Sequence, residues 1–189
     1  MKNILVLLLF VSPLVSIGQN LINDNFPTKD GLIYYSEVVI TDSLTSNDLY
    51  INAKKWIAEN IKSSQTAIQV DDKDAKLIIL KSYVSKGHNT YVSNPKNWFT
   101  LKIELKDGKY KYSLYDIRYE FDVNYMGQFN HTEKAIEEWM KPSDSDISEK
   151  KRQKINEALT LYCIELNSEF MNVIKSLEKG MKIKENSEW

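Results

Sequence analysis

The clearest hydrophobic pattern lies in the middle of the chain, where apolar and polar residues alternate strictly on both sides of an Asp-Gly pair. Alternation with this period indicates β-strands with one buried face, and Asp-Gly favours the type I′ turn of a two-residue hairpin. The sequence therefore predicts a hairpin that turns at Asp107-Gly108 and carries both apolar rows on one face. Those rows are Phe99, Leu101, Ile103, Leu105, Tyr110, Tyr112 and Leu114.

The alternation changes phase after Leu114. From this point the bulky residues are Tyr115, Ile117, Tyr119 and Phe121, which occupy odd instead of even positions. A β-bulge, which inserts one extra residue into a strand, produces such a change. Burial of the strand end on both faces would produce it too, and the sequence leaves both explanations open.

A period of three to four residues predicts a helix over about residues 46–62. Thr45 and Asp48 have the spacing of a capping box at its start. The apolar face of this helix consists of Leu49, Ala53, Trp56, Ile57 and Ile61.

A second, longer helix is predicted near the end of the chain. Asp146 is expected to cap it, with Glu149 completing a capping box, and Gly180 is expected to stop it after about Lys179. A helix of about 33 residues is about 50 Å long, which leaves room for part of it to overhang a small domain. Its apolar stripe runs through Ile155, Leu159, Tyr162, Leu166, Phe170, Val173 and Leu177.

The remaining segments carry weaker signals. Residues 32–41, 68–70 and 77–84 are rich in β-branched and aromatic residues and predict strands. Residues 20–30 are polar and predict an extended lead-in, whereas residues 133–140 predict a short helix in an otherwise irregular region.

The N-terminus has the layout of a secretory signal peptide. Lys2 precedes an apolar run over residues 4–15, and Ser16-Ile17-Gly18 places small residues before a cut at Gln19. We therefore expect a secreted or periplasmic protein that begins at about Gln19 and has no stable membrane insertion after cleavage. The apolar run is shorter than the roughly 20 residues that span a bilayer. An uncleaved anchor or a buried N-terminal helix is the alternative.

Four short stretches resemble a secreted bacterial domain of unknown function with a TATA-binding-protein-like (TBP-like) fold. They are Ile33–Val39, Leu49-Tyr50 with Ala53–Trp56, Ile68–Ala75 and Lys106–Tyr112, and the resemblance covers about residues 26–121. The resemblance implies a fold and a compartment but no activity. It also implies no DNA binding, because a fold does not carry a function with it.

Together these signals predict an α+β fold: an antiparallel β-sheet with a helix packed on one face, plus a long C-terminal α-helix. We expect a signal peptide (1–18), a TBP-like α+β domain (19–121), a C-terminal helical extension (122–180) and a polar tail (181–189). The expected core contains Trp56, Ile57, Ile61, Leu101, Ile103, Leu105 and Tyr112.

Composition removes several functional classes. The chain has 189 residues, with 25 Lys and Arg against 26 Asp and Glu and a net charge of −1, so it has no general attraction for nucleic acid. Its six glycines form no phosphate-binding loop. The single cysteine, Cys163, lies in the apolar stripe of the long helix and is expected to be a buried structural thiol.

The sequence offers no convergent catalytic or metal-binding set. His88 and His131 lie in polar segments without a partner at metal-ligand spacing, so we predict no metal and no cofactor. The balance of these signals is against an enzyme. A carboxylate-based hydrolase would need two acids such as Glu120 and Asp122 to converge in a cleft with perturbed pKa values.

The leading functional hypothesis is a non-enzymatic secreted or periplasmic module that binds an apolar small molecule or an envelope protein, but not nucleic acid. A ligand would lie between the sheet and the helices near Trp98, Tyr112 and Tyr115. The alternative is an envelope protein that forms homo-oligomers through the C-terminal helix, if its apolar stripe exceeds what one sheet can cover.

Overall fold

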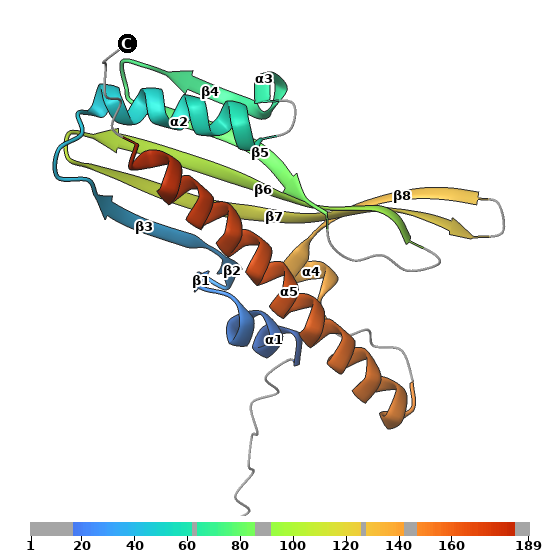
Figure 1. Cartoon of the computed structure of the whole chain (residues 1–189). Coiled ribbons are helices and arrows are strands. Elements are labelled where there is room, and N and C mark those ends of the chain that lie inside the picture. The colour runs from blue at the N-terminus through green and yellow to red at the C-terminus, as the bar shows by residue number, and fades with distance from the viewer. Residues whose placement is uncertain (1–16, 62–63, 86–91, 126–127, 142–146, 184–189) are drawn as a thin grey trace, which may run out of the picture.

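The computed structural model describes residues 17–61, 64–85, 92–125, 128–141 and 147–183. Its centre is a six-stranded antiparallel sheet in the order β3-β7-β6-β5-β4, and β8 pairs with the distal half of β7. Two helices, α2 and α5, cover one face of this sheet (Figure 1). The predicted α+β class, with an antiparallel sheet and a long C-terminal helix, is confirmed.

The bounds of the elements follow the chain. The helices are α1 (Ile17–Asn25), α2 (Ser46–Asn60), α3 (Ser64–Ala67), α4 (Ile136–Trp139) and α5 (Glu149–Met181). The strands are β1 (Thr28–Lys29), β2 (Leu32–Ile33), β3 (Tyr35–Ile40), β4 (Ile68–Asp72), β5 (Leu77–Val84), β6 (Val92–Lys106), β7 (Lys109–Tyr125) and β8 (Gln128–Ala135).

The predicted hairpin forms from β6 and β7. Leu105 pairs with Tyr110, and Gly108 has a φ of 73° in the turn, a left-handed conformation that suits glycine. The change of phase is a β-bulge: the register shifts between the pairs Trp98–Arg118 and Thr100–Tyr115. Within the bulge, Asp116 has a φ of 54°. The bulge therefore explains why odd residues of β7 face the helices beyond this point.

The core lies between the sheet and the two helices. All seven predicted core residues are buried. The capping box of Thr45 and Asp48 is present at the start of α2. Trp56 of α2 reaches α5, where its Nε1 donates a hydrogen bond to Ser176 Oγ at 3.0 Å.

Helix α5 packs on the sheet with its C-terminal two thirds. Its buried residues are Cys163, Leu166, Phe170, Ile174, Leu177 and Met181. Ile155, in the same apolar stripe, is 41% exposed, so the N-terminal turns extend beyond the cover of the sheet (Figure 1). Two expectations about the ends were wrong: the N-cap is Ser148, not Asp146, and Gly180 lies inside the helix, against Trp56.

Three segments differ from the prediction. Residues 17–25 form α1 instead of an extended lead-in, because Ile22 and the following Phe26 are buried in the core. Residues 128–135 form β8, so the expected short helix is confined to α4. The expected boundary between residues 121 and 122 falls inside β7, and α5 shares one hydrophobic core with the sheet. The expected signal peptide and polar tail lie mostly outside the described residues.

Among the described residues, no helix is both long enough and apolar enough to cross a membrane.

Candidate functional site

The face of the sheet opposite the helices carries the candidate site. Even-numbered residues of β6 point to this face, and the bulge at Asp116 places Arg118 and Glu120 of β7 there too. Next to the bulge lies a hollow of about 170 Å³. It is lined by Lys81, Trp98, Phe99, Thr100, Asp116, Arg118, Glu120 and Glu133.

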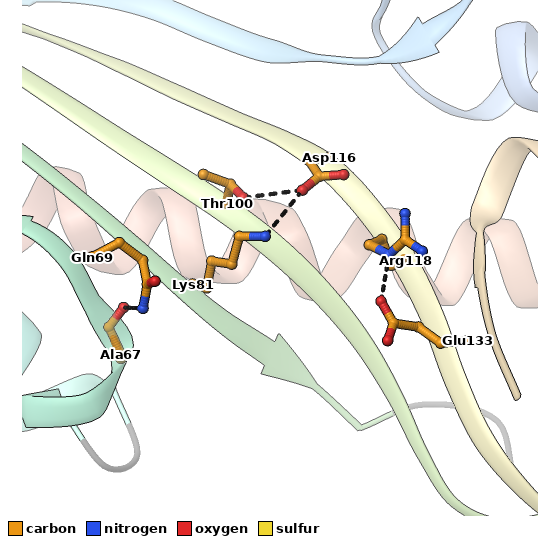
Figure 2. A network of polar contacts seen from close by, with 7 residues as sticks. All are labelled: Ala67, Gln69, Lys81, Thr100, Asp116, Arg118 and Glu133. Carbon is orange, nitrogen blue, oxygen red and sulfur yellow. Dashed lines mark hydrogen bonds and ion pairs between the residues drawn. The ribbon is translucent and has the colours of Figure 1, made fainter. Parts of the chain in front are cut away.

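Two ion pairs join residues that line the hollow, and Figure 2 shows both. Lys81 Nζ on β5 lies 3.4 Å from Asp116 Oδ2, and Thr100 Oγ1 donates to the same oxygen at 3.5 Å. Arg118 Nε donates to Glu133 Oε1 on β8. The bulge is therefore tied to β5 through a side chain, and β7 is tied to β8.

A third ion pair involves Glu120, which also lines the hollow. Lys96 Nζ donates to Glu120 Oε1 at 2.7 Å, and Trp98 Nε1 donates to Glu120 Oε2 at 2.5 Å. Burial alone would raise the pKa of Glu120, but the hydrogen bonds from Lys96 and Trp98 outweigh it and lower the pKa. Glu120 is thus placed as an ionised partner rather than as the proton donor that a hydrolase would need.

Aromatic rings form the rim. The rings of Tyr83 and Trp98 lie 4.9 Å apart, and Lys96 Nζ lies 5.6 and 5.7 Å from their centroids. These distances are within the range of cation–π attraction. On the same face, the rings of Tyr34 and Tyr115 lie 5.9 Å apart. The open face therefore combines half-buried aromatic surface with paired charges.

A group of possible metal ligands lies beside the hollow. One ligand atom each from Glu120, His131 and Glu133 lies within 4.8 Å of the other two. His131 Nδ1 lies 3.1 Å from Asp122 Oδ1. A cation would have to displace Lys96 from Glu120 and also break the Arg118 contact with Glu133. This group is therefore better explained as part of a network of ion pairs between β6, β7 and β8.

The sequence analysis did not predict this network of ion pairs, because its residues lie on different strands. Antiparallel pairing of β7 with β8 places Glu120 opposite Glu133 and Asp122 opposite His131. The polar segment that contains His131 is therefore a strand, whereas His88 lies outside the described residues. Local spacing gives no signal for such cross-strand pairs.

The structure does not bring the three predicted site residues together. Trp98 and Tyr115 lie on the open face, but Tyr112 points toward the helices and is 5% exposed. The Tyr112 hydroxyl donates to Glu37 Oε2 at 3.2 Å. Around it, the space between the sheet and the helices is occupied by buried core side chains.

Cys163 is a buried thiol on α5. Its Sγ lies 3.6 Å from Met140 Sδ, and burial raises its pKa to about 12. A thiol with so high a pKa forms little of the thiolate that reacts as a nucleophile.

The comparisons with known proteins agree with this architecture. The class is an α+β domain with a TBP-like fold. Two solved structures share it: a TBP-like protein from Parabacteroides distasonis (16% identity, 84% of this chain and 98% of that chain, TM-score 0.62) and a DUF4468 family protein from Bacteroides ovatus (13% identity, 89% and 97%, TM-score 0.53).

The sequence of the central segment is similar to a known family. Residues 35–120 match the family described as "Domain of unknown function (DUF4468) with TBP-like fold". The resemblance to a domain of unknown function with a TBP-like fold is thereby confirmed. No curated protein matches the chain. At 13–16% identity the solved structures establish the fold alone.

Proposed function

We propose that the protein is a non-enzymatic interaction module that acts in the periplasm or outside the cell and binds a protein partner with the open face of its sheet. The hollow beside Asp116 is the observation that carries this proposal. Its volume of about 170 Å³ is below the 300–1,000 Å³ or so of typical small-molecule sites. A cavity of about 150 Å³ holds a benzene-sized group, so the hollow fits one side chain of a partner.

The charges around the hollow favour a neutral contact. Its two lining cations, Lys81 and Arg118, are each paired with a carboxylate, and Lys96 pairs with the third lining carboxylate, Glu120. No excess charge is left to attract a phosphate or a nucleic acid. A neutral hollow with an aromatic rim suits an apolar or aromatic side chain that is buried at the centre of a protein interface.

The residue types on this face support a protein partner. Tryptophan, tyrosine and arginine dominate the binding energy of protein interfaces, and the open face presents Trp98, Tyr83 and Arg118 around the hollow. The surrounding ion pairs would form the polar rim that such interfaces have.

Site-specific crosslinking tests the proposal. A photoreactive amino acid at Lys81, which lines the hollow, should give one major adduct in living cells, and the same probe at Lys175, on the exposed side of α5, should not. The adduct partner is then identified and purified. Trp98→Ala should weaken its affinity about thirtyfold, the effect of losing a hot spot of about 2 kcal/mol. Equal adducts from both positions, or unchanged affinity in a folded Trp98→Ala variant, would refute the proposal.

The proposed location has its own test. If the signal peptide is removed before Gln19, the intact mass of the protein recovered from the periplasm or the medium should equal that of residues 19–189. A full-length mass in the cytoplasmic fraction alone would contradict export.

A second candidate function is assembly through α5. Leu161 and Ile164 are 63% and 53% exposed, and Ile155 is exposed in the overhanging turns. Burying such side chains between copies would be favourable. Leu161→Glu should then lower the oligomeric state measured by light scattering, whereas a monomeric wild type would exclude this candidate.

A further inference from the structure

The sheet exposes edges that differ in their protection. Unpaired strand edges attract other strands, and proteins protect them with charges, bulges or short lengths. Strand β4 ends in Asp71-Asp72 and has a register shift between Ile68 and Val70. Strand β8 carries Glu133 and Lys134 in addition to His131. Both of these outer strands are therefore protected against pairing with another strand.

Strand β3 lacks this protection. Its sequence, Tyr35–Ile40, contains no lysine, arginine or proline. Val38 and Ile40 are 52% and 58% exposed, and both point to the open face. The only charged residue, Glu37, lies on the other face, where its carboxylate accepts the hydrogen bond from Tyr112. An apolar outer strand of this kind favours strand addition.

The backbone of β3 is free on its outer side. Thr41 N donates to Gly108 O at 2.8 Å, which continues the register of β3 with β7 and shows that odd residues bond to β7. The even residues Ser36, Val38 and Ile40 therefore point their N–H and C=O groups outward. In the described part of the chain, β3 pairs with β7 alone. Just before β3 the outer edge is occupied by another described segment, since Tyr34 N donates to Pro27 O.

We propose that β3 pairs antiparallel with β3 of a second copy of this chain, with Val38 opposite Ile40 of the second copy. This register uses outward-pointing even residues on both strands, as antiparallel hydrogen-bonded pairs require. It joins the exposed apolar side chains of both copies, sets Val39 on the two-fold axis and places Glu37 opposite Thr41. The interface is self-complementary, brings no like charges together, and closes as a dimer.

The first test compares a charge introduced on β3 with the same charge introduced on β4. We expect the full exported chain to form a dimer in native mass spectrometry and light scattering at micromolar concentration. Val38→Lys places a charge on the outer edge of β3 and should raise the dimer dissociation constant at least tenfold. Val70→Lys makes the same change on the open face of the outer strand β4 and should leave the dimer intact. Both side chains are exposed, so circular dichroism should report an unchanged fold.

A cysteine at the axis tests the register. Residues that face each other at a non-hydrogen-bonded antiparallel position have Cα atoms about 4.5 Å apart, which suits a disulfide. Val39→Cys should therefore give a covalent dimer under mild oxidation, and Val38→Cys should give much less. The native Cys163 is buried and should not contribute.

Each result decides the proposal. A dimer that weakens in Val38→Lys, persists in Val70→Lys and crosslinks through Val39→Cys supports it. A wild type that is monomeric at 100-fold higher concentration overturns it. A dimer that survives Val38→Lys but is lost in Leu161→Glu also overturns it and assigns assembly to α5. None of these results depends on the hollow, so the proposal can fail while the proposed function stands.

Discussion

Gly180 gives the sharpest prediction about stability, because its expected effect has the opposite sign to that of an ordinary helical glycine. It lies in the last turn of α5 against Trp56 of α2. A Cβ atom at this position would lie 2.9 Å from Trp56 Cδ1, 3.1 Å from its Cβ and 3.2 Å from its Cγ. We expect Gly180→Ala to destabilise the protein.

Two contributions oppose each other in this variant. Replacing glycine by alanine inside a helix stabilises it by about 1 kcal/mol at most, and by less in a terminal turn. Overpacking a core contact costs about 1–3 kcal/mol. Trp56 has little room to move, because it is 3% exposed and its Nε1 is hydrogen-bonded to Ser176. The clash also involves the Cβ of Trp56, which cannot move without its backbone.

The clash should therefore outweigh the gain in helix propensity by about 1 kcal/mol. For a chain of this size, that corresponds to a fall in Tm of about 2–4 °C. Urea unfolding followed by circular dichroism, together with a thermal melt, measures both quantities. Asn172→Ala on the exposed side of α5 is the control, and it should be neutral or stabilise by a few tenths of a kcal/mol.

A double-mutant cycle isolates the contact. In a Trp56→Leu background, Gly180→Ala should cost less than in the wild type, because the ring that it meets is absent. The reasoning is refuted if Gly180→Ala raises Tm as much as an unhindered alanine substitution would, or if its cost is the same in both backgrounds.

Further predictions concern buried polar groups and pH. The Tyr110 hydroxyl is buried and has no hydrogen-bond partner among the described residues, so Tyr110→Phe should raise the free energy of unfolding by about 1 kcal/mol, whereas Tyr112→Phe should lower it by a similar amount. Cys163 should resist a thiol reagent at pH 8 in the native state, because burial raises its pKa to about 12, and should react once urea unfolds the chain; rapid native labelling would contradict its burial. Hydrogen bonds from Lys54 and then Tyr50 lower the pKa of Asp71, so their stabilisation is present above the unfolded pKa of about 3.9 and is lost as the pH falls through the lower folded pKa. Lys54→Met should therefore cost about 0.2–1 kcal/mol at pH 7 and nothing below that folded pKa, as urea midpoints at neutral and acidic pH would measure; an equal cost at both would disprove the assignment.

The local signals in the sequence were sufficient for much of the fold. Asp107-Gly108 predicted the position of the turn and the register of the central hairpin, and the spacing of Thr45 and Asp48 predicted the start of α2. Both features depend on residues that are close in sequence, so the residue types at those positions are enough to predict them. The predicted type I′ turn was wrong, because Gly108 has a positive φ and Asp107 does not. The phase change after Leu114 also indicated a possible bulge, which the structure confirms at Asp116.

Strand β8 could not be predicted in the same way. The described residues from Asn130 to Lys134 are exposed or half-buried on both faces, so no alternation of apolar and polar residues marks the strand. The candidate site depends on this strand, because Glu133 and His131 reach β7 only through cross-strand pairing. A site assembled from such pairs becomes visible when the register is known, and the predicted set of Trp98, Tyr112 and Tyr115 lacked that information.

The bulge at Asp116 divides β7 into two halves, and the parity of the residues that face the helices differs between them. Before it, even residues such as Leu114 face the helices; after it, odd residues such as Ile117 do. A regular strand of the same length, with the bulge flattened, would turn Arg118 and Glu120 into the core and expel Ile117 and Tyr119. Deleting Asp116 would instead remove the extra residue together with the bulge, and Ile117 and Tyr119 would stay on the inner face. The apolar pattern of the distal half therefore fits the present chain length only if the extra residue is taken up in a bulge.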